Sequence, residues 1–156
     1  MAKDHPGNVD YTGTGSAQKG TSKLGRVVAR RRSAILIVGD ETDTLTRYAR
    51  SLSAYGYAVD FAHDDATVAR LTREKAFDVV VNDIDMRNCC DGQSLRRLRK
   101  ENRRVPVVVL SGCLAFASAR AALDCGAHKY LVKPVSDERL LEVLVEAIQD
   151  ATSRAH

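Results

Sequence analysis

The sequence predicts an α/β domain built on an open, doubly wound sheet of five parallel strands with five helices. From Ala34 onward, short apolar runs alternate with stretches of helical periodicity, which is the pattern of repeated βα units. These runs, such as AILIV and VVV, are rich in β-branched residues and lack polar alternation, as in strands that are covered on both faces. We therefore expect a buried parallel sheet that binds ligands beyond the carboxyl ends of its strands.

The expected strands are short and are separated by segments with helical spacing. They cover residues 34–38, 57–61, 78–82, 106–110 and 129–132. After the first strand, Leu45, Tyr48 and Leu52 recur on one helix face. The same spacing recurs in two later helices, at Leu95, Leu98, Leu141, Leu144, Val145 and Ile148.

Helix-capping residues divide the chain in the same way. Gly56 and Gly126 follow two helical segments at the place where a left-handed cap is favoured. Ser136 is a predicted N-cap, and Asp137 and Glu138 after it place negative charge in the first turn, where the helix dipole favours it. These signals set the boundaries of the first, fourth and fifth helices.

A length of 156 residues with 44% hydrophobic side chains suits one domain. Residues 1–33 are basic and have almost no apolar periodicity, so we expect a disordered tail there. The expected domain then covers residues 34–151, and residues 152–156 form a C-terminal tail. The cluster Arg30-Arg31-Arg32 suits a solvated linker better than a contact with nucleic acid, because no aromatic residues are interleaved with it.

The sequence contains no signal-peptide core and no apolar stretch of about 18 residues, so we expect no membrane association and a cytoplasmic location. Its four cysteines, Cys89, Cys90, Cys113 and Cys125, have neither a C-x-x-C spacing nor the pattern of a disulfide framework. That usage agrees with a reducing compartment. For Cys89, Cys90 and Cys113, idle thiols are favoured over a redox-sensitive or metal site.

Polar residues stand where four of the apolar runs end. Asp40, Asp83, Ser111 and Lys133 each follow a different run. Because the carboxyl ends of parallel strands meet at one edge of a sheet, we expect these side chains to converge there, exposed and outside the core. Carboxylates, a hydroxyl and an ammonium group together suit a divalent cation and a phosphoryl group.

This arrangement resembles the receiver domain of two-component response regulators, which has the chemotaxis-type flavodoxin-like fold with strand order 2-1-3-4-5. Members carry an acidic pair after the first strand, a phosphoacceptor Asp after the third, Ser or Thr after the fourth, and Lys-Pro after the fifth. The matching residues in this sequence are Gly39-Asp40, Asp83, Ser111 and Lys133-Pro134. The resemblance implies a cis peptide bond at Lys133-Pro134. It also implies an aromatic switch at Tyr130, although an ordinary half-buried strand residue fits that position equally well.

The resemblance further implies the chemistry of the site. Asp83 would accept a phosphoryl group from a sensor histidine kinase or a phosphotransfer protein. Mg²⁺ would be held by Asp40, Asp83 and the backbone carbonyl of Asp85. Lys133 and Ser111 would contact the phosphoryl oxygens, with Ser111 and Tyr130 forming the switch. The chain would then be a signalling domain that catalyses at most its own phosphorylation and dephosphorylation.

Residues 114–148 would form the output surface, which would contact a downstream protein target or a covalently linked output domain. The sequence is compatible with a single-domain regulator and with the receiver part of a longer protein.

The sequence departs from the family pattern at two places. Gly39 takes the place of the first acid, so we expect weaker Mg²⁺ binding. Asp85 either partly replaces that charge or faces water. Arg87 stands where the family commonly has proline, and Gly92 lies nine residues after Asp83, which predicts a reshaped loop.

Two alternative functions are open. The string Asp83-Ile84-Asp85 resembles the D-x-D pair of haloacid-dehalogenase-type phosphatases, but two βα units precede it and only one helix follows Lys133, which is the wrong order for such an enzyme. Gly39 and the altered loop also suggest a degenerate receiver that docks partners without being phosphorylated. Retention of Asp83, Ser111 and Lys133 favours phosphorylation.

Overall fold

The computed structural model describes residues 31–40, 42–84, 93–112 and 116–155. Several predictions from the sequence concern residues outside these ranges. They are the disorder of the basic tail, the role of the Asp85 carbonyl, the reshaped loop around Arg87 and Gly92, and the state of Cys89, Cys90 and Cys113.

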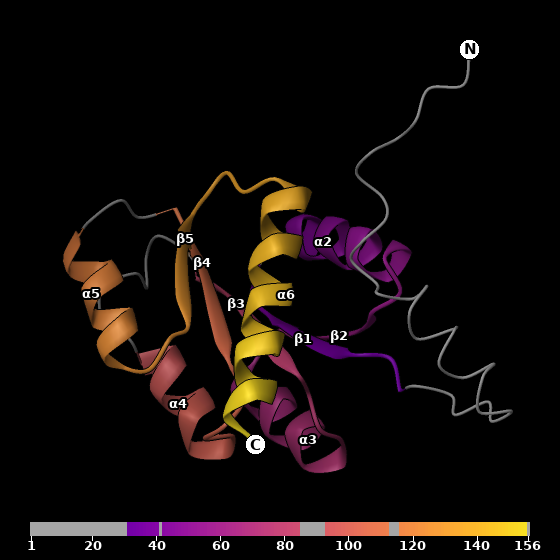
Figure 1. Cartoon of the computed structure of the whole chain (residues 1–156). Helices are drawn as coiled ribbons and strands as arrows, with labels where there is room; N and C mark the ends of the chain where they lie inside the picture. Colours follow the sequence, from indigo (N-terminus) through magenta and orange to yellow (C-terminus); the bar gives the residue numbers. More distant parts are fainter. Residues whose placement is uncertain (1–30, 41, 85–92, 113–115, 156) are drawn as a thin grey trace, which may run out of the picture. The chain divides into compact units, whose positions relative to one another are not determined.

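The sheet is the predicted one, with five parallel strands in the order β2-β1-β3-β4-β5 (Figure 1). Three strands begin one residue later than expected, and β3 and β4 continue through Asp83 and Ser111. They continue because ladder hydrogen bonds join backbone groups and do not require apolar side chains. The strands are β1 (Ala34–Val38), β2 (Ala58–Ala62), β3 (Val79–Ile84), β4 (Val107–Ser111) and β5 (Lys129–Val132).

Five helices connect and follow the strands. The predicted caps are confirmed, since Gly56 and Gly126 have φ of 94° and 95°, and Ser136 Oγ accepts a hydrogen bond from the Arg139 amide at 3.1 Å. The last helix continues to Arg154, three residues beyond the expected end of the domain. Within the described ranges, no helix has the length and apolarity needed to cross a membrane. The helices are α2 (Thr42–Ala54), α3 (Asp65–Glu74), α4 (Gln93–Glu101), α5 (Phe116–Asp124) and α6 (Asp137–Arg154).

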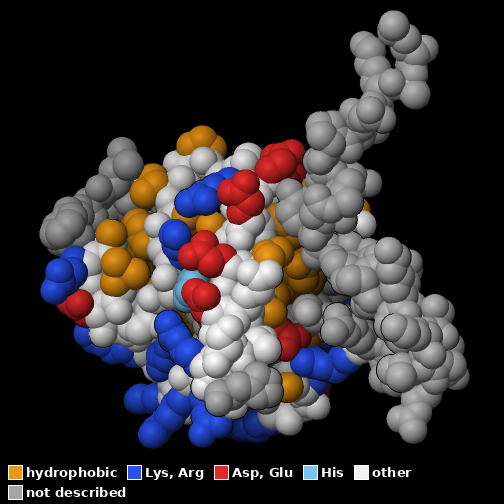
Figure 2. All heavy atoms as spheres, in the orientation of Figure 1, with side chains coloured by type: hydrophobic (Ala, Val, Ile, Leu, Met, Phe, Trp, Pro, Cys, Tyr) orange, Lys and Arg blue, Asp and Glu red, His pale blue; other side chains and the backbone are white. Residues whose placement is uncertain are grey.

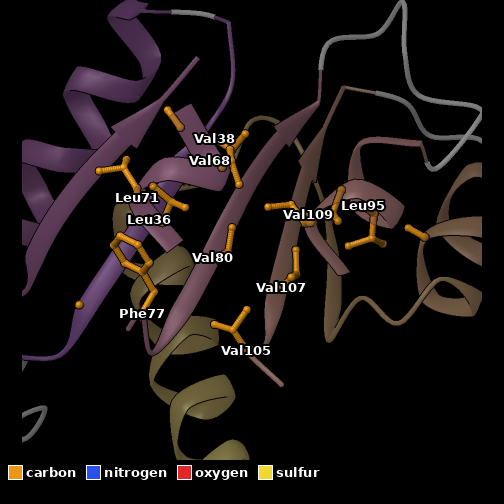
Figure 3. Packing of buried hydrophobic residues seen from close by; sticks show 14 residues of the cluster. Leu36, Val38, Val68, Leu71, Phe77, Val80, Leu95, Val105, Val107 and Val109 are labelled. Atoms are coloured by element: carbon orange, nitrogen blue, oxygen red, sulfur yellow. The ribbon is translucent and has the colours of Figure 1, made fainter. Parts of the chain in front are cut away.

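The helices cover both faces of the sheet. α3 and α4 pack on one face, where their Leu71 and Leu95 meet sheet residues such as Val80 and Val109 (Figure 3). α2 and α6 pack together on the other face, and Tyr48 and Leu144 are almost fully buried there. Because both faces are closed, the polar side chains at the carboxyl ends of the strands are held on a rigid base.

Candidate functional site

Strand register brings Asp83, Ser111 and Lys133 to one edge of the sheet. Asp83 pairs with Leu110 across β3 and β4, and Ser111 pairs with Val132 across β4 and β5. Lys133 follows β5 directly, and its backbone amide donates to the Ser111 carbonyl at 2.8 Å. The Lys133 ammonium forms an ion pair with the Asp83 carboxylate. Three of the residues that the sequence singled out therefore lie together.

The expectation that the strand ends are exposed is wrong for Asp83 and Ser111, whereas Asp40 is exposed as expected. Asp83 is 7% exposed and Ser111 is fully buried, while the Lys133 side chain is 22% exposed. Asp83 and Ser111 lie inside the sheet, where they pair with Leu110 and Val132 of the neighbouring strands, and Lys133 pairs with the carboxylate. The charge of Asp83 is thus balanced by an ammonium group more than by water. Removing one partner of a buried ion pair lowers the stability of the fold, because the other charge is left buried and unpaired.

Two further residues lie as the family resemblance implies. The Lys133-Pro134 peptide bond is cis. Tyr130 on β5 is half-buried and packs against the hydrophobic cluster beneath α3, α4 and α5. This packing is compatible with a switch residue and with an ordinary strand aromatic.

A pocket of about 290 Å³ lies at the carboxyl ends of β1 and β3. Carboxylates from three segments line it, two of them at the start of α3, where Asp64 is the N-cap and Asp65 the first helical residue. The concentration of negative charge favours a cation. The charged or titratable lining residues are Asp40, His63, Asp64, Asp65, Asp83 and Arg97.

Two of the four carboxylates are held by residues of the helices beside the pocket. Asp64 caps α3 by accepting from the Thr67 amide at 2.7 Å, and the hydrogen bonds from Thr67 hold the pKa of Asp64 below its ordinary value. Asp65 accepts from Arg97 at 2.6 Å. Asp40, exposed just after β1, and Asp83, paired with Lys133, are the remaining candidates for a metal.

This donor set fits Mg²⁺. The ion prefers oxygen ligands, keeps several waters and is usually bound through one or two carboxylates, and Asp40 and Asp83 both line the pocket. Among the described residues, the only three ligating side chains with donor atoms within 4.8 Å of one another are His128, Glu146 and Asp150. That group lies at the amino ends of the strands, away from Asp83.

Gly39 packs tightly between its neighbours. Its amide donates to the Ala62 carbonyl at 3.1 Å, and its own carbonyl accepts from His63 Nδ1 at 2.9 Å. A β-carbon at this position would lie 2.9 Å from the β-carbon of Asp83. The residue that replaces the family's first acid is therefore in close contact with the backbone and β-carbon of Asp83.

Sequence reasoning missed Asp64, Asp65, His63 and Arg97. Asp64 carries a readable signal, since an Asp just before a helical run is a favoured N-cap. The pair of Asp65 and Arg97 spans 32 residues, and no local pattern connects two positions so far apart.

Comparison with known proteins decides the family. The family model for the response regulator receiver domain matches residues 35–145. The chain belongs to this family. Among curated proteins, the receiver is 30% identical over 119 residues to the transcriptional regulatory protein ZraR of Salmonella typhimurium, covering 76% of this chain and 27% of that protein. It is 34% identical over 107 residues to the response regulator MprA of Mycobacterium ulcerans, covering 69% of this chain and 46% of that protein.

Solved receiver structures agree with this assignment. A receiver domain protein from Clostridium thermocellum superposes with a TM-score of 0.69 at 27% identity, over 78% of this chain and 98% of the other. The receiver domain of a Pseudomonas aeruginosa sensor histidine kinase superposes with a TM-score of 0.63 at 27% identity, over 76% of this chain and 99% of the other. That structure has a magnesium ion coordinated in its active-site cleft. This chain spans about a quarter to a half of the curated relatives it matches.

Proposed function

We propose that Asp83 accepts a phosphoryl group from the phosphohistidine of a sensor kinase or phosphotransfer protein, and that this receiver signals through the change that follows. The observation that carries the proposal is the Asp83 carboxylate, paired with Lys133 on the wall of a pocket that also presents Asp40. Relatives named transcriptional regulatory protein and response regulator support the signalling role. As for the family, we place this reaction in the cytoplasm.

The residues of the chain divide the chemistry between them. An Asp83 carboxylate oxygen attacks phosphorus and forms a new O–P bond, while the P–N bond breaks and its electron pair returns to the donor histidine. The Lys133 ammonium already lies on the attacking carboxylate and then shares its charge with a phosphoryl oxygen. Asp40 and Asp83, with the Asp85 carbonyl, would hold Mg²⁺, which when bound screens the repulsion between carboxylate and phosphoryl group.

Ser111 and Tyr130 are the proposed switch. The Ser111 hydroxyl lies fully buried at the end of β4, beside the strand that carries Asp83. Its hydrogen bond to a phosphoryl oxygen would exist only in the phosphorylated state, so it would favour the active conformation. Tyr130 would then repack, changing the surface over residues 114–148 that contacts a target protein or a linked output domain.

Intact-mass measurement after incubation of the full chain with acetyl phosphate and Mg²⁺ tests this function. The wild type should gain one phosphoryl group, and Asp83→Asn should gain none. The control variant Asp65→Asn, which changes a carboxylate in the same pocket, should still gain one. Phosphorylation of Asp83→Asn would overturn the assignment. A folded wild type that gains nothing would instead support the degenerate receiver, and turnover of a generic aryl phosphate would support the phosphatase alternative.

A further inference from the structure

A groove of about 840 Å³ lies at the amino ends of the strands, on the opposite side of the sheet from the pocket at Asp83. It is bounded by Pro106 before β4, by His128 before β5 and by the C-terminal end of α6. Figure 2 shows Lys and Arg side chains gathered at the lower end of the molecule, toward the ends of α4 and α6 in Figure 1. The arginines that line the groove are Arg99, Arg103, Arg104 and Arg154.

Arg99 holds the walls of this groove together. Its Nη1 donates to the Val105 carbonyl at 2.6 Å and to the Arg103 carbonyl at 3.2 Å, and its Nη2 donates to the Gly126 carbonyl. These bonds tie the segment after α4 to the turn before β5. A cleft that is already formed costs little ordering entropy when a ligand binds.

Among the residues that the structure describes, few carboxylates balance the positive charge of the groove. Within the described part of the chain, none of its four arginines forms a salt bridge, and the single acid on its wall, Asp150, lies 3.7 Å from His128. Burial also lowers the pKa of Arg99, so an anion there would relieve a desolvated charge. Arginines outside the groove differ in this respect, because several of them pair with carboxylates. These are Arg70, Arg97, Arg120 and Arg139.

The groove favours an anion even though His128, Glu146 and Asp150 could ligate a metal ion. Lys129 lies 3.8 Å from Glu146 and competes for that carboxylate. The four guanidinium groups of the adjoining groove also repel a cation, since charges interact over about 10 Å at 0.1 M salt. Charge therefore selects a negatively charged ligand.

The size and lining of the groove further restrict the class of ligand. Its volume lies in the range of about 300–1,000 Å³ that is usual for small-molecule sites. Pro106, Ala127, Ala147 and Ala151 also line the groove and offer small apolar side chains against which a flat ring fits. Guanidinium groups bind phosphate with two parallel hydrogen bonds. One ligand class carries both a flat ring and several phosphates.

We propose that this groove binds a nucleoside polyphosphate, with the phosphates on Arg103, Arg104 and Arg154 and the base against the alanine wall. This site is separate from the phosphorylation pocket, and it goes beyond the phosphoacceptor function. Arg99 shapes the groove and is left unchanged in the test.

Calorimetric titration of the full chain without Mg²⁺, using ATP, inorganic triphosphate and adenosine, tests the proposal. ATP should bind more tightly than triphosphate, and adenosine should bind weakly. Arg104→Ala/Arg154→Ala should weaken ATP binding by about tenfold or more, since each lost guanidinium removes charge-assisted hydrogen bonds. The control Arg50→Ala/Arg120→Ala removes the same charge from exposed positions outside the groove and should change affinity by less than about twofold.

Three results would overturn the proposal. Equal weakening by both double variants would show unspecific attraction to a basic protein. Loss of binding in Asp83→Asn would place the nucleotide in the phosphorylation pocket, whereas the proposal expects unchanged affinity. Tighter binding of a poly-glutamate peptide or a single-stranded oligonucleotide than of ATP would reassign the groove to a macromolecular partner. Melting temperatures of the variants, expected to lie near that of the wild type, confirm that each is folded.

Discussion

Gly39 and Asp83 approach each other so closely that a side chain at position 39 would require its neighbours to shift. A β-carbon there would lie 2.9 Å from Asp83 Cβ and 3.1 Å from the Asp83 carbonyl oxygen. Gly39 is not among the described glycines with positive φ. The backbone conformation therefore does not call for glycine here, and the close approach of Asp83 is what disfavours a side chain. The sequence suggested only a lost metal-binding carboxylate at this position. The structure adds that a side chain at this position would press directly on the proposed phosphoacceptor.

Gly39→Ala should therefore destabilise the protein by about 1–3 kcal/mol, as overpacking of a tight site does. Gly39→Asp adds the same β-carbon and should lose similar stability without Mg²⁺. When Mg²⁺ is added, Gly39→Asp should regain more stability than Gly39→Ala does, because the new carboxylate would lie near the cation. Thermal melts of both variants with and without Mg²⁺ measure this. An alanine variant as stable as the wild type would show that β1 and β3 separate without cost.

The sheet was predictable because its strands are continuous runs of β-branched residues. Such runs are typical of strands in a sheet covered on both faces, and Val79, Val80 and Val81 are indeed fully buried. The strand ends were less predictable. β3 and β4 include Asp83 and Ser111 because backbone pairing ignores side-chain polarity, and for this reason the expected exposure of these two side chains was wrong.

The site was predictable where one residue per strand end carries the signal, as at Asp83, Ser111 and Lys133. It was not predictable where two distant segments meet. The clash at Gly39 depends on the spacing of two strands, and the pair of Asp65 and Arg97 depends on how α3 and α4 pack. These relations exist only in three dimensions.

Lys133→Ala should lower stability by roughly 1–3 kcal/mol, because it leaves the Asp83 carboxylate buried without its ammonium partner. From the sequence alone, Lys133 was expected to matter little for stability, since its strand end was expected to be exposed. Asp83→Asn in the Lys133→Ala background should restore part of the loss. Chemical denaturation of the wild type, the two single variants and the double variant completes a double-mutant cycle, which gives the coupling energy between Lys133 and Asp83. A coupling energy near zero would mean that the ion pair does not support the fold.

Gly126→Ala should cost more stability than Gly56→Ala. Both glycines have positive φ, so alanine at either position costs about 1–2 kcal/mol in backbone strain. A β-carbon at Gly126 would in addition lie 3.2 Å from Arg99 Nε, whereas one at Gly56 meets nothing within 4 Å. Melting temperatures of the two variants give the comparison. Equal losses would show that Arg99 moves aside freely.

Asp40→Asn should remove most of the Mg²⁺ affinity, whereas Asp65→Asn should change it little. Both carboxylates line the same pocket, so each contributes to the local negative potential. Asp65 is held by Arg97 at 2.6 Å, while Asp40 is exposed beside Asp83 at the end of β1. A direct ligand contributes far more to the affinity for a hard cation than a nearby screened charge does. Mg²⁺ titration followed by calorimetry or by amide NMR shifts measures both variants against the wild type. If the two changes weaken binding equally, the pocket attracts the ion only through its overall charge, and Asp40 is not a ligand.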